Sequence, residues 1–430
     1  MQLPLLLSKP LKLFVAIYNF FLVLYRLAIS ISSLWSPKAR KWIRGRRNVF
    51  EHIRREIGGQ PPASIWIHCS SLGEFEQGKP LIEMLRMQHP RYKIVLTFFS
   101  PSGYEVKKKY SGVDHVFYLP MDSKKNSARF LDLINPVLII FVKYDYWYYY
   151  LDQIKKRKIN CLLISAVFRK NQAFFEWYGG LQRRMLDCFT QIFVQTEESK
   201  SLLTSVRIHN CIVSGDTRFD SVVDTVNKFT GLPAIEKFLG EQKCIVAGST
   251  WRDDEEILKK AFEFPGTREL KLIIAPHEVH KTHLDHLQRL FPESCEFSKL
   301  ESSGPQDFRT LIIDNVGMLS RLYKYAYITY VGGGFTKDGV HNVLEAAAYG
   351  RPVVFGPNYK KYREAGELID SGGAQCFHDA AELANIIARL GKEKNEYEMR
   401  SAASGLYVSA NKGASRRIMN YIEENRLLTN

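Results

Sequence analysis

The fold is decided by one short stretch, Ile65-Trp66-Ile67-His68-Cys69-Ser70-Ser71-Leu72-Gly73-Glu74-Phe75-Glu76. Its apolar first half predicts a buried strand, and the pattern that follows predicts a helix, since Leu81, Met84 and Leu85 share one face. Open parallel α/β sheets keep their chemistry in such loops, at the carboxyl ends of the strands. Glu74 is therefore a candidate base for an attacking hydroxyl, although many loop glutamates are only solvated or cap a helix.

Strand-like runs alternate with helical patterns along the rest of the chain. The runs are 65–70, 93–100, 136–142, 160–168, 191–196 and 211–215, followed by 243–250, 270–277, 310–315, 325–334, 351–357 and 374–378. This alternation predicts an α/β fold in which parallel sheets are covered by helices on both faces.

The length of 430 residues exceeds what one core usually organises, so we expect two domains. No strand pattern occurs in 216–241, and we place the junction there. The expected divisions are 1–55, 56–225 and 226–430, while the last helical segment, 415–427, could pack on either domain. Two Rossmann-like, doubly wound domains facing each other across a cleft form the GT-B fold of many nucleotide-sugar glycosyltransferases, but the pattern alone supports this only as an analogy.

The net charge and the spacing of the cysteines indicate what kind of partner the chain binds and in which compartment it works. The net charge of +15 indicates an anionic partner, which could be nucleic acid, an acidic membrane or a phosphorylated substrate. The seven cysteines are dispersed and none forms a close C-x-x-C pair, which argues against a cysteine metal or redox motif and favours a reducing compartment. Aromatic residues cluster in apolar runs rather than alternating with Lys and Arg, so we expect no nucleic acid partner.

The first 55 residues predict contact with a membrane. The run 13–25 is almost wholly apolar, and a narrow polar stripe recurs every seven residues at Lys12, Asn19, Arg26 and Ser33. A basic cluster follows, made of Lys38, Arg40, Lys41, Arg44, Arg46, Arg47, Arg54 and Arg55. A cleaved signal peptide, a spanning helix, a surface-lying helix and an ordinary core helix all fit some of this pattern. We favour membrane association, with an anionic surface as partner, and leave spanning open.

A second group of candidate residues surrounds three consecutive glycines in Tyr330-Val331-Gly332-Gly333-Gly334-Phe335. Glycine lets the backbone approach a phosphate closely, and a helix start attracts anions. The segment 340–348 predicts such a start, with Glu345 one turn in, where it could bind ribose hydroxyls. The residues that we assign to this site are Gly333, Gly334, His341, Asn342 and Glu345, the last three on one helical face. The alternative is a tight turn beside an exposed helix charge.

Two further strand ends indicate the same chemistry. Ser249 and Thr250 end the first strand of the second half, where their hydroxyls could contact an anion. Pro276 and His277 end the second strand, where the imidazole could contact a nucleotide. The histidines nearby lack both the H-E-x-x-H spacing and a third ligand, so we expect no metal.

With these motifs in place, the chain resembles the 3-deoxy-D-manno-octulosonic acid (Kdo) transferases of lipopolysaccharide assembly, glycosyltransferase family 30. The resemblance covers nearly the whole chain. It is carried by Trp66-Ile67-His68, Ser71-Leu72-Gly73-Glu74 and the stretches 97–103, 118–122, 215–220, 248–250 and 356–357.

The resemblance implies a GT-B enzyme that transfers Kdo from CMP-Kdo to a lipid A precursor, with inversion and without a metal or cofactor. It assigns acceptor binding to 56–225 and CMP-Kdo binding to 226–430, and it implies the cytoplasmic face of the bacterial inner membrane. Glu74 is then the general base, Arg218 reaches the donor phosphate or the Kdo carboxylate, and Asp145 helps orient the reacting groups. The implied CMP contacts are Pro276, His277, Gly317, Met318, Leu319, Asn342 and Glu345.

The chain departs from the family pattern mainly on the acceptor side. Where the family usually carries Glu-Thr-Glu-Leu-Trp-Pro, this chain has Lys143-Tyr144-Asp145-Tyr146-Trp147-Tyr148. The family's Gly-Glu-Leu is Gly317-Met318-Leu319 here. Two alternatives stay open: a GT-B enzyme that uses another nucleotide sugar on a lipid, and a catalytically inactive relative.

Overall fold

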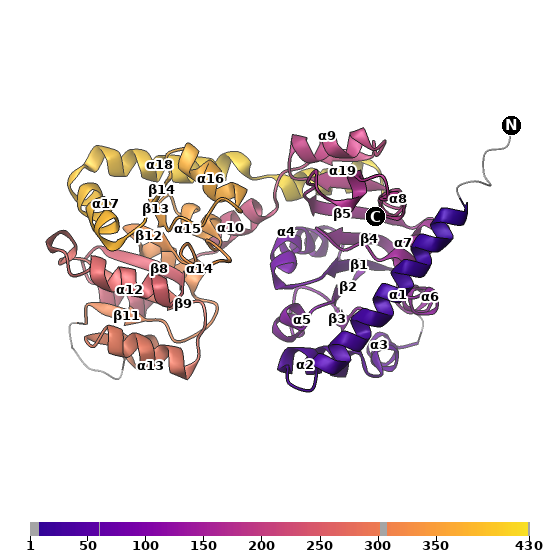
Figure 1. The fold of residues 1–430 in the computed structure, drawn as a ribbon, viewed down its shortest axis with the longest axis horizontal. Coiled ribbons are helices and arrows are strands. Elements are labelled where there is room, and N and C mark those ends of the chain that lie inside the picture. The colour runs from indigo at the N-terminus through magenta and orange to yellow at the C-terminus, as the bar shows by residue number, and fades with distance from the viewer. Residues whose placement is uncertain (1–7, 60, 302–307, 429–430) are drawn as a thin grey trace. The chain divides into compact units, whose positions relative to one another are not determined.

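The chain forms two compact units, each built round one parallel sheet (Figure 1). The structure, a computed structural model, describes residues 8–59, 61–301 and 308–428. Unit 1 comprises Met1–Ser221 with Gly413–Asn430, and unit 2 comprises Val222–Lys412. The predicted α/β class, with two Rossmann-like parts, is confirmed.

The sheet of unit 1 has the strand order β3-β2-β1-β4-β5-β6-β7. Its strands are β1 (Ser64–Cys69), β2 (Lys93–Phe98), β3 (His115–Tyr118), β4 (Pro136–Val142), β5 (Asn160–Ala166), β6 (Gln191–Val194) and β7 (Cys211–Val213). The helices between them are α4 (Leu72–Gln88), α5 (Pro101–Lys107), α6 (Lys124–Ile134), α7 (Tyr148–Lys156), α8 (Gly180–Leu186) and α9 (Glu197–Ser205). All residues of β1 are buried, because helices cover a parallel sheet on both faces.

The sheet of unit 2 has the order β10-β11-β9-β8-β12-β13-β14. Its strands are β8 (Cys244–Thr250), β9 (Lys271–Pro276), β10 (Ser294–Glu296), β11 (Thr310–Ile312), β12 (Ile328–Val331), β13 (Val353–Phe355) and β14 (Ala374–Cys376). The helices are α11 (Pro233–Leu239), α12 (Arg252–Ala261), α13 (Lys281–Leu290), α14 (Leu319–Leu322), α15 (Val343–Ala347), α16 (Arg363–Asp370), α17 (Ala380–Lys392) and α18 (Lys394–Asn411).

Each of the twelve predicted runs contains a strand, and the sequence analysis missed two strands, β3 and β10. Both lie at an edge of their sheet. An edge strand has one neighbour and needs fewer apolar residues. The three residues of β10, Ser-Cys-Glu, accordingly show no apolar run.

The N-terminal helix α1 (Ser8–Ser32) runs along one side of unit 1 (Figure 1). Over Leu11–Ser32 it is the one described helix that is long and apolar enough to cross a membrane. Leu11, Phe14, Val15 and Tyr18 pack against the unit 1 core. The other side is exposed and apolar, and includes Leu13, Ile17, Phe20, Phe21, Val23, Leu24, Leu27 and Ile31.

The polar stripe expected on α1 does not form one solvent-facing line. Asn19 Oδ1 accepts a hydrogen bond from the Tyr149 hydroxyl at 2.9 Å, and so faces the body of unit 1. The neighbouring Tyr18 hydroxyl donates to Asp122 at 2.6 Å. These two polar contacts fix the helix against the protein.

The residues of the basic cluster have two roles: one points into unit 1, and others stay exposed. It lies on α2 (Pro37–Arg46), α3 (Val49–Ile57) and their junction. Arg46 points inward, where its guanidinium donates to the carbonyls of Phe99 at 2.7 Å and Leu119 at 3.0 Å and lies 4.0 Å from the Trp42 ring centroid. Arg46 therefore joins α2 to the sheet, while residues such as Arg47 remain exposed.

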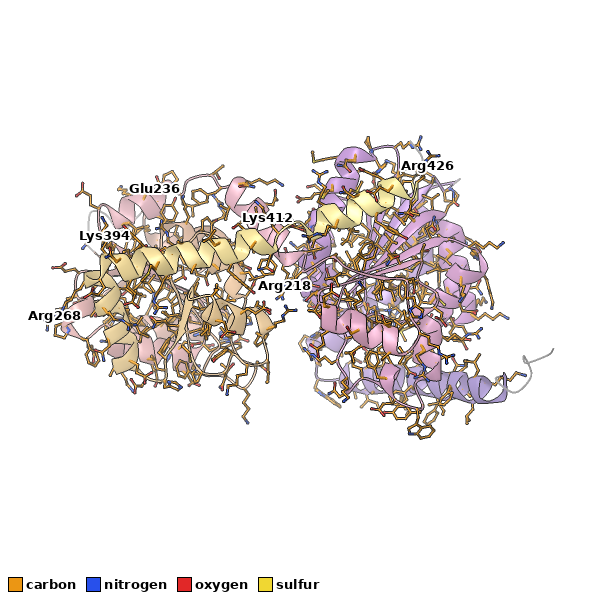
Figure 2. The ribbon with its side chains drawn as sticks, turned by 90° about the horizontal axis from the view of Figure 1, so that it is seen from above. Arg218, Glu236, Arg268, Lys394, Lys412 and Arg426 are labelled. Atoms are coloured by element: carbon orange, nitrogen blue, oxygen red, sulfur yellow. The ribbon has the colours of Figure 1, made fainter. Side chains whose placement is uncertain are left out.

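The C-terminal segment belongs to unit 1 by its contacts. The chain leaves unit 1 within α10 (Arg218–Asn227) and returns after the labelled Lys412 at the end of α18 (Figure 2). In α19 (Ala414–Glu424), Ile418, Met419 and Ile422 complete the apolar core beside β1 and β2. The sequence analysis had grouped this segment with 226–430 in its division of the chain, while noting that it could pack on either domain.

We expect Arg46→Ala to lower the free energy of unfolding by about 2–4 kcal/mol, because it removes two charge-assisted hydrogen bonds and the cation–π contact with Trp42, and leaves two carbonyls without their donor. Arg47→Ala, which removes an exposed guanidinium next in sequence, is the control and should change the free energy by less than about 0.5 kcal/mol. Urea denaturation of both variants measures the difference. Equal losses would show that Arg46 does not hold α2 in place.

Candidate active site

Strand order determines where the candidate residues of unit 1 gather. The order reverses between β1 and β4, so the loops after these two strands diverge and leave a crevice at their carboxyl ends. Glu74 follows β1, and Asp145 follows β4. The predicted base and its predicted helper thus flank the same switch point.

Glu74 occupies the third position of α4 and closes a capping box with Ser71. Its Oε2 accepts from the backbone N–H of Ser71 at 2.9 Å and lies 3.4 Å from the Ser71 hydroxyl. The structural role that the sequence analysis weighed against catalysis is therefore present. It also holds the carboxylate still, as a catalytic base requires.

The surroundings of Glu74 make it more basic than an ordinary glutamate. Burial and the negative charge of Asp145 raise the pKa of Glu74 to about 7, against the smaller lowering effects of His68 and the N–H groups of the loop. A carboxyl with this pKa can take up a proton near neutral pH, which is the property expected of a general base.

Asp145 is held by a buried network. One of its oxygens lies 2.6 Å from His68 Nε2, and the other accepts from the Ser70 hydroxyl at 2.9 Å. The same Nε2 of His68 also accepts from the indole N–H of Trp147 at 3.4 Å. On its other side the His68 ring contacts Thr97 Oγ1 at 2.7 Å. His68 was not among the predicted site residues; its place inside an apolar strand was the available signal of a special role.

Arg218 lies at the start of α10 (Figure 2). Its guanidinium contacts Asp216 at 2.7 and 2.8 Å, and its backbone N–H donates to the same side chain at 2.9 Å. Asp216 therefore orients Arg218 and offsets part of its charge.

In unit 2 the strand order reverses between β8 and β12, and the predicted residues again follow these strands. The expectation that His341, Asn342 and Glu345 share a helical face is wrong, because α15 begins only at Val343. Asn342 is the N-cap, whose Oδ1 accepts from the Leu344 N–H at 3.2 Å. Its amide donates to Glu345 at 2.9 Å, so these two side chains do meet.

The three glycines are required by close packing of the backbone. A Cβ on Gly332 would lie 2.4 Å from the Ser249 carbonyl oxygen, and one on Gly334 would lie 2.5 Å from the Gly356 nitrogen. Gly333 has a φ of +89° and donates its N–H to the buried Asp254 at 2.9 Å. The tight-turn alternative thus accounts for much of this motif, and the Gly333 amide already has an acceptor.

An aromatic stack lies beside these glycines. The ring centroids of Trp251 and His277 are 4.7 Å apart, and those of His277 and His341 are 4.4 Å apart, with interplanar angles of 28° and 17°. The Trp251 indole donates to His341 Nε2 at 2.9 Å. Burial and the neighbouring His277 lower the pKa of His341 to about 4, so the imidazole is neutral. Trp251 was missed by the sequence analysis, although it directly follows the predicted Ser249 and Thr250.

The remaining predicted residues of unit 2 lie at two places. One group is at the strand ends, Ser249, Thr250 and Pro276, and the other is at the start of α14, Gly317, Met318 and Leu319. Thr250 is fully buried and donates its hydroxyl to Glu255 at 2.9 Å, which gives it a structural role; Ser249 beside it has a φ of +54°. Pro276 ends β9 alongside Thr250. Gly317, with a φ of +99°, and Met318 lead into α14, whose first residue is Leu319. Within the described residues, no three His, Cys, Asp or Glu side chains are grouped to hold a metal.

Comparison with known proteins gives consistent matches. A family model described as 3-deoxy-D-manno-octulosonic-acid transferase (kdotransferase) matches residues 44–221. The 3-deoxy-D-manno-octulosonic acid transferase of Aquifex aeolicus is 30% identical over 343 residues, which cover 78% of this chain and 88% of that protein. The corresponding transferase of Haemophilus influenzae is 25% identical over 421 residues, covering 92% and 95%.

One relative is considerably longer than this chain. A bifunctional glycosyltransferase/methyltransferase of Fusobacterium nucleatum is 26% identical over 385 residues, covering 85% of this chain. The chain spans only 55% of that protein's length.

Solved structures show the same architecture at low identity. A UDP-GlcNAc 2-epimerase from Neisseria meningitidis has a TM-score of 0.60 and 17% identity, and covers 84% of this chain and 100% of its own. Anabaena HepE in complex with UDP has a TM-score of 0.54 and 11% identity, covering 84% and 100%. These likenesses concern the fold alone, and they confirm the predicted GT-B class.

We expect Glu74→Gln to be more stable than the parent chain above about pH 7 and equally stable near pH 4. The pKa of Glu74 is raised in the folded state, so its contribution to stability is complete below its unfolded pKa near 4.5 and is lost as the pH rises to about 7. Glutamine does not titrate, and the gain should be on the order of 1–3 kcal/mol.

Urea denaturation at several pH values measures this difference. Glu198→Gln, an exposed glutamate of α9, controls for the loss of a surface charge. A pH-independent difference between Glu74→Gln and the parent chain would contradict a raised pKa at this position.

Proposed function

The chain belongs to the family of 3-deoxy-D-manno-octulosonic acid transferases, and on this premise we propose that it transfers Kdo from CMP-Kdo to a lipid A precursor in lipopolysaccharide core biosynthesis. The observation that carries the proposal is a fixed glutamate, Glu74, with a pKa of about 7 at the switch point of the unit 1 sheet.

Glu74 supplies the base in this mechanism. The acceptor hydroxyl gives its proton to the Glu74 carboxylate while its oxygen bonds to the anomeric carbon of Kdo. CMP leaves from the opposite face with the electrons of the broken carbon–oxygen bond, which inverts the configuration. The capping contact with Ser71 keeps the carboxylate from swinging away as it takes up the proton.

Asp145 and His68 prepare Glu74 for this step. The negative charge of Asp145 raises the pKa of Glu74, and the contact with His68 fixes where that charge lies. Asp145 is therefore a positioning residue that adjusts the basicity of its neighbour. The segment that differs most from the family pattern nevertheless keeps an acidic side chain at Asp145.

Unit 2 supplies the nucleotide site. Glu345, oriented by the Asn342 amide, is suited to accept hydrogen bonds from ribose hydroxyls. The neutral rings of His277 and His341 supply hydrogen-bonding edges without adding positive charge. Met318 and Leu319 sit at the start of α14, where the family places further contacts to CMP.

Arg218 is proposed to attract the anionic groups of the donor, the Kdo carboxylate or the CMP phosphate. Asp216 holds its guanidinium in one orientation, which lowers the entropy lost when an anion binds. No metal is proposed for this mechanism, because the leaving group is a monophosphate.

The enzyme is proposed to work at the cytoplasmic face of the inner membrane. The exposed apolar side of α1 fits the hydrocarbon region, and the exposed basic residues of α2, α3 and their junction, such as Arg47, fit the anionic headgroups. All seven cysteines are unpaired, as expected in a reducing compartment.

Transfer of Kdo from CMP-Kdo to a tetraacylated lipid A precursor tests the proposal directly. We expect product from the parent chain and a loss of at least ~100-fold in Glu74→Ala. The rate should rise with pH and level off above about 7, where Glu74 is deprotonated. Equal rates in the two proteins would remove Glu74 from the mechanism.

Calorimetric titration with CMP and UDP tests the nucleotide site. We expect CMP to bind more tightly, and Glu345→Gln to weaken CMP binding about tenfold through the loss of a charged acceptor. Glu256→Gln, on the exposed side of α12, is the matched control. Tighter binding of UDP would favour the alternative, a GT-B glycosyltransferase with a different nucleotide sugar.

A further inference from the structure

An apolar groove lies between α1 and the loops of the unit 1 switch point. Its cavity has a volume of about 530 Å³. Phe99 and Trp147 form one wall, with ring centroids 4.7 Å apart, and Leu22 of α1 belongs to the other. Most of the remaining lining is also apolar, as in pockets that bind the apolar part of a ligand.

One end of this groove is polar and adjoins the reacting groups. Ser70 and Asp145 both line it, and they are joined by the 2.9 Å hydrogen bond described above. Ser70 lies between β1 and α4, the helix that carries Glu74, and Asp145 adds to the effect of burial in raising the pKa of Glu74. A molecule in the groove therefore lies beside the site of proton transfer.

The side of the groove formed by α1 continues onto the exposed face of that helix. Ile17, Phe21 and Tyr25 follow one another at intervals of four and so share one face. All three line the groove, yet they are 47%, 68% and 41% exposed. The groove is thus continuous with the apolar surface that we place in the membrane.

The helix is fixed in this position by polar contacts with the catalytic segment. Tyr18 donates to Asp122, which also accepts from the backbone N–H groups of Tyr149 and Tyr150 at 3.0 and 3.1 Å. The hydroxyl of Tyr149 returns a bond to Asn19. A helix that served only as a tether would not need to dock on the segment that follows β4.

From this arrangement we infer that the groove binds one acyl chain of the lipid acceptor and so positions the acceptor hydroxyl at Glu74. The inference rests on the proposed function, and it assigns to α1 a part in acceptor recognition. The groove is apolar where a chain would lie, is open towards the membrane at α1, and ends at hydrogen-bonding groups where the sugar would begin. The acceptor is the one substrate in the proposed reaction that has both parts.

The test fills the groove with Leu22→Trp and, as a second variant at the more exposed lip, Ile17→Trp. We expect each to raise the KM for the tetraacylated precursor by at least ~10-fold, because a chain excluded from the groove loses several buried methylenes. The rate with a deacylated precursor should stay within about twofold, since that acceptor has no chain to exclude. Val23→Trp, on the same helix and 65% exposed but outside the groove, is the control and should match the parent chain.

Loss of the acylated and the deacylated activities to the same degree would overturn the inference, as would unchanged KM values in both groove variants. Absence of transfer by the parent chain with either acceptor would instead count against the proposed function. Binding in the groove can then be measured without transfer. An acceptor with a photoreactive acyl chain should label the segment around Trp147 in the parent chain and in Val23→Trp, but not in Leu22→Trp. Equal competition by phosphatidylethanolamine would identify a general lipid groove and overturn the assignment to the acceptor.

Discussion

The 2.6 Å contact between the Asp145 carboxylate and the buried His68 imidazole joins the first strand of the unit 1 sheet to the segment that follows its neighbour β4. Burying a charge is costly unless a partner offsets it, so this pair fixes the geometry of both loops. Three further features depend on it. Together with burial, the charge of Asp145 raises the pKa of Glu74. The position of Asp145 defines the polar end of the apolar groove, and the segment after β4 provides the docking site for α1.

Much of this arrangement follows from local sequence. Parallel strands need apolar residues on both faces, and twelve of the fourteen strands show the expected runs. Glu74 could be predicted because its loop follows such a run. The edge strand β10 could not, since its residues Ser-Cys-Glu form no apolar run, whereas the run Val116-Phe117-Tyr118 of β3 was overlooked.

Contacts between residues far apart in the sequence could not be predicted from local sequence patterns. The pairing of His68 with Asp145 joins residues 77 positions apart, and nothing in either local pattern encodes it. Helical periodicity placed His341 inside a helix that begins two residues later, at Val343, because the Asn342 side chain bonds the backbone as the N-cap. The three glycines were correctly noticed, but a pattern cannot distinguish glycine needed for close backbone packing from glycine needed for a phosphate.

The return of the chain to unit 1 has a consequence for synthesis. Gly413 and Ser415 donate their N–H groups to Asp220, and α19 then fills part of the core beside β1 and β2. The ribosome makes α1 before unit 2 and α19 after it. Unit 1 therefore completes its core only after unit 2 has emerged, and the part of unit 1 that is made first must wait for α19 before its sheet is fully covered.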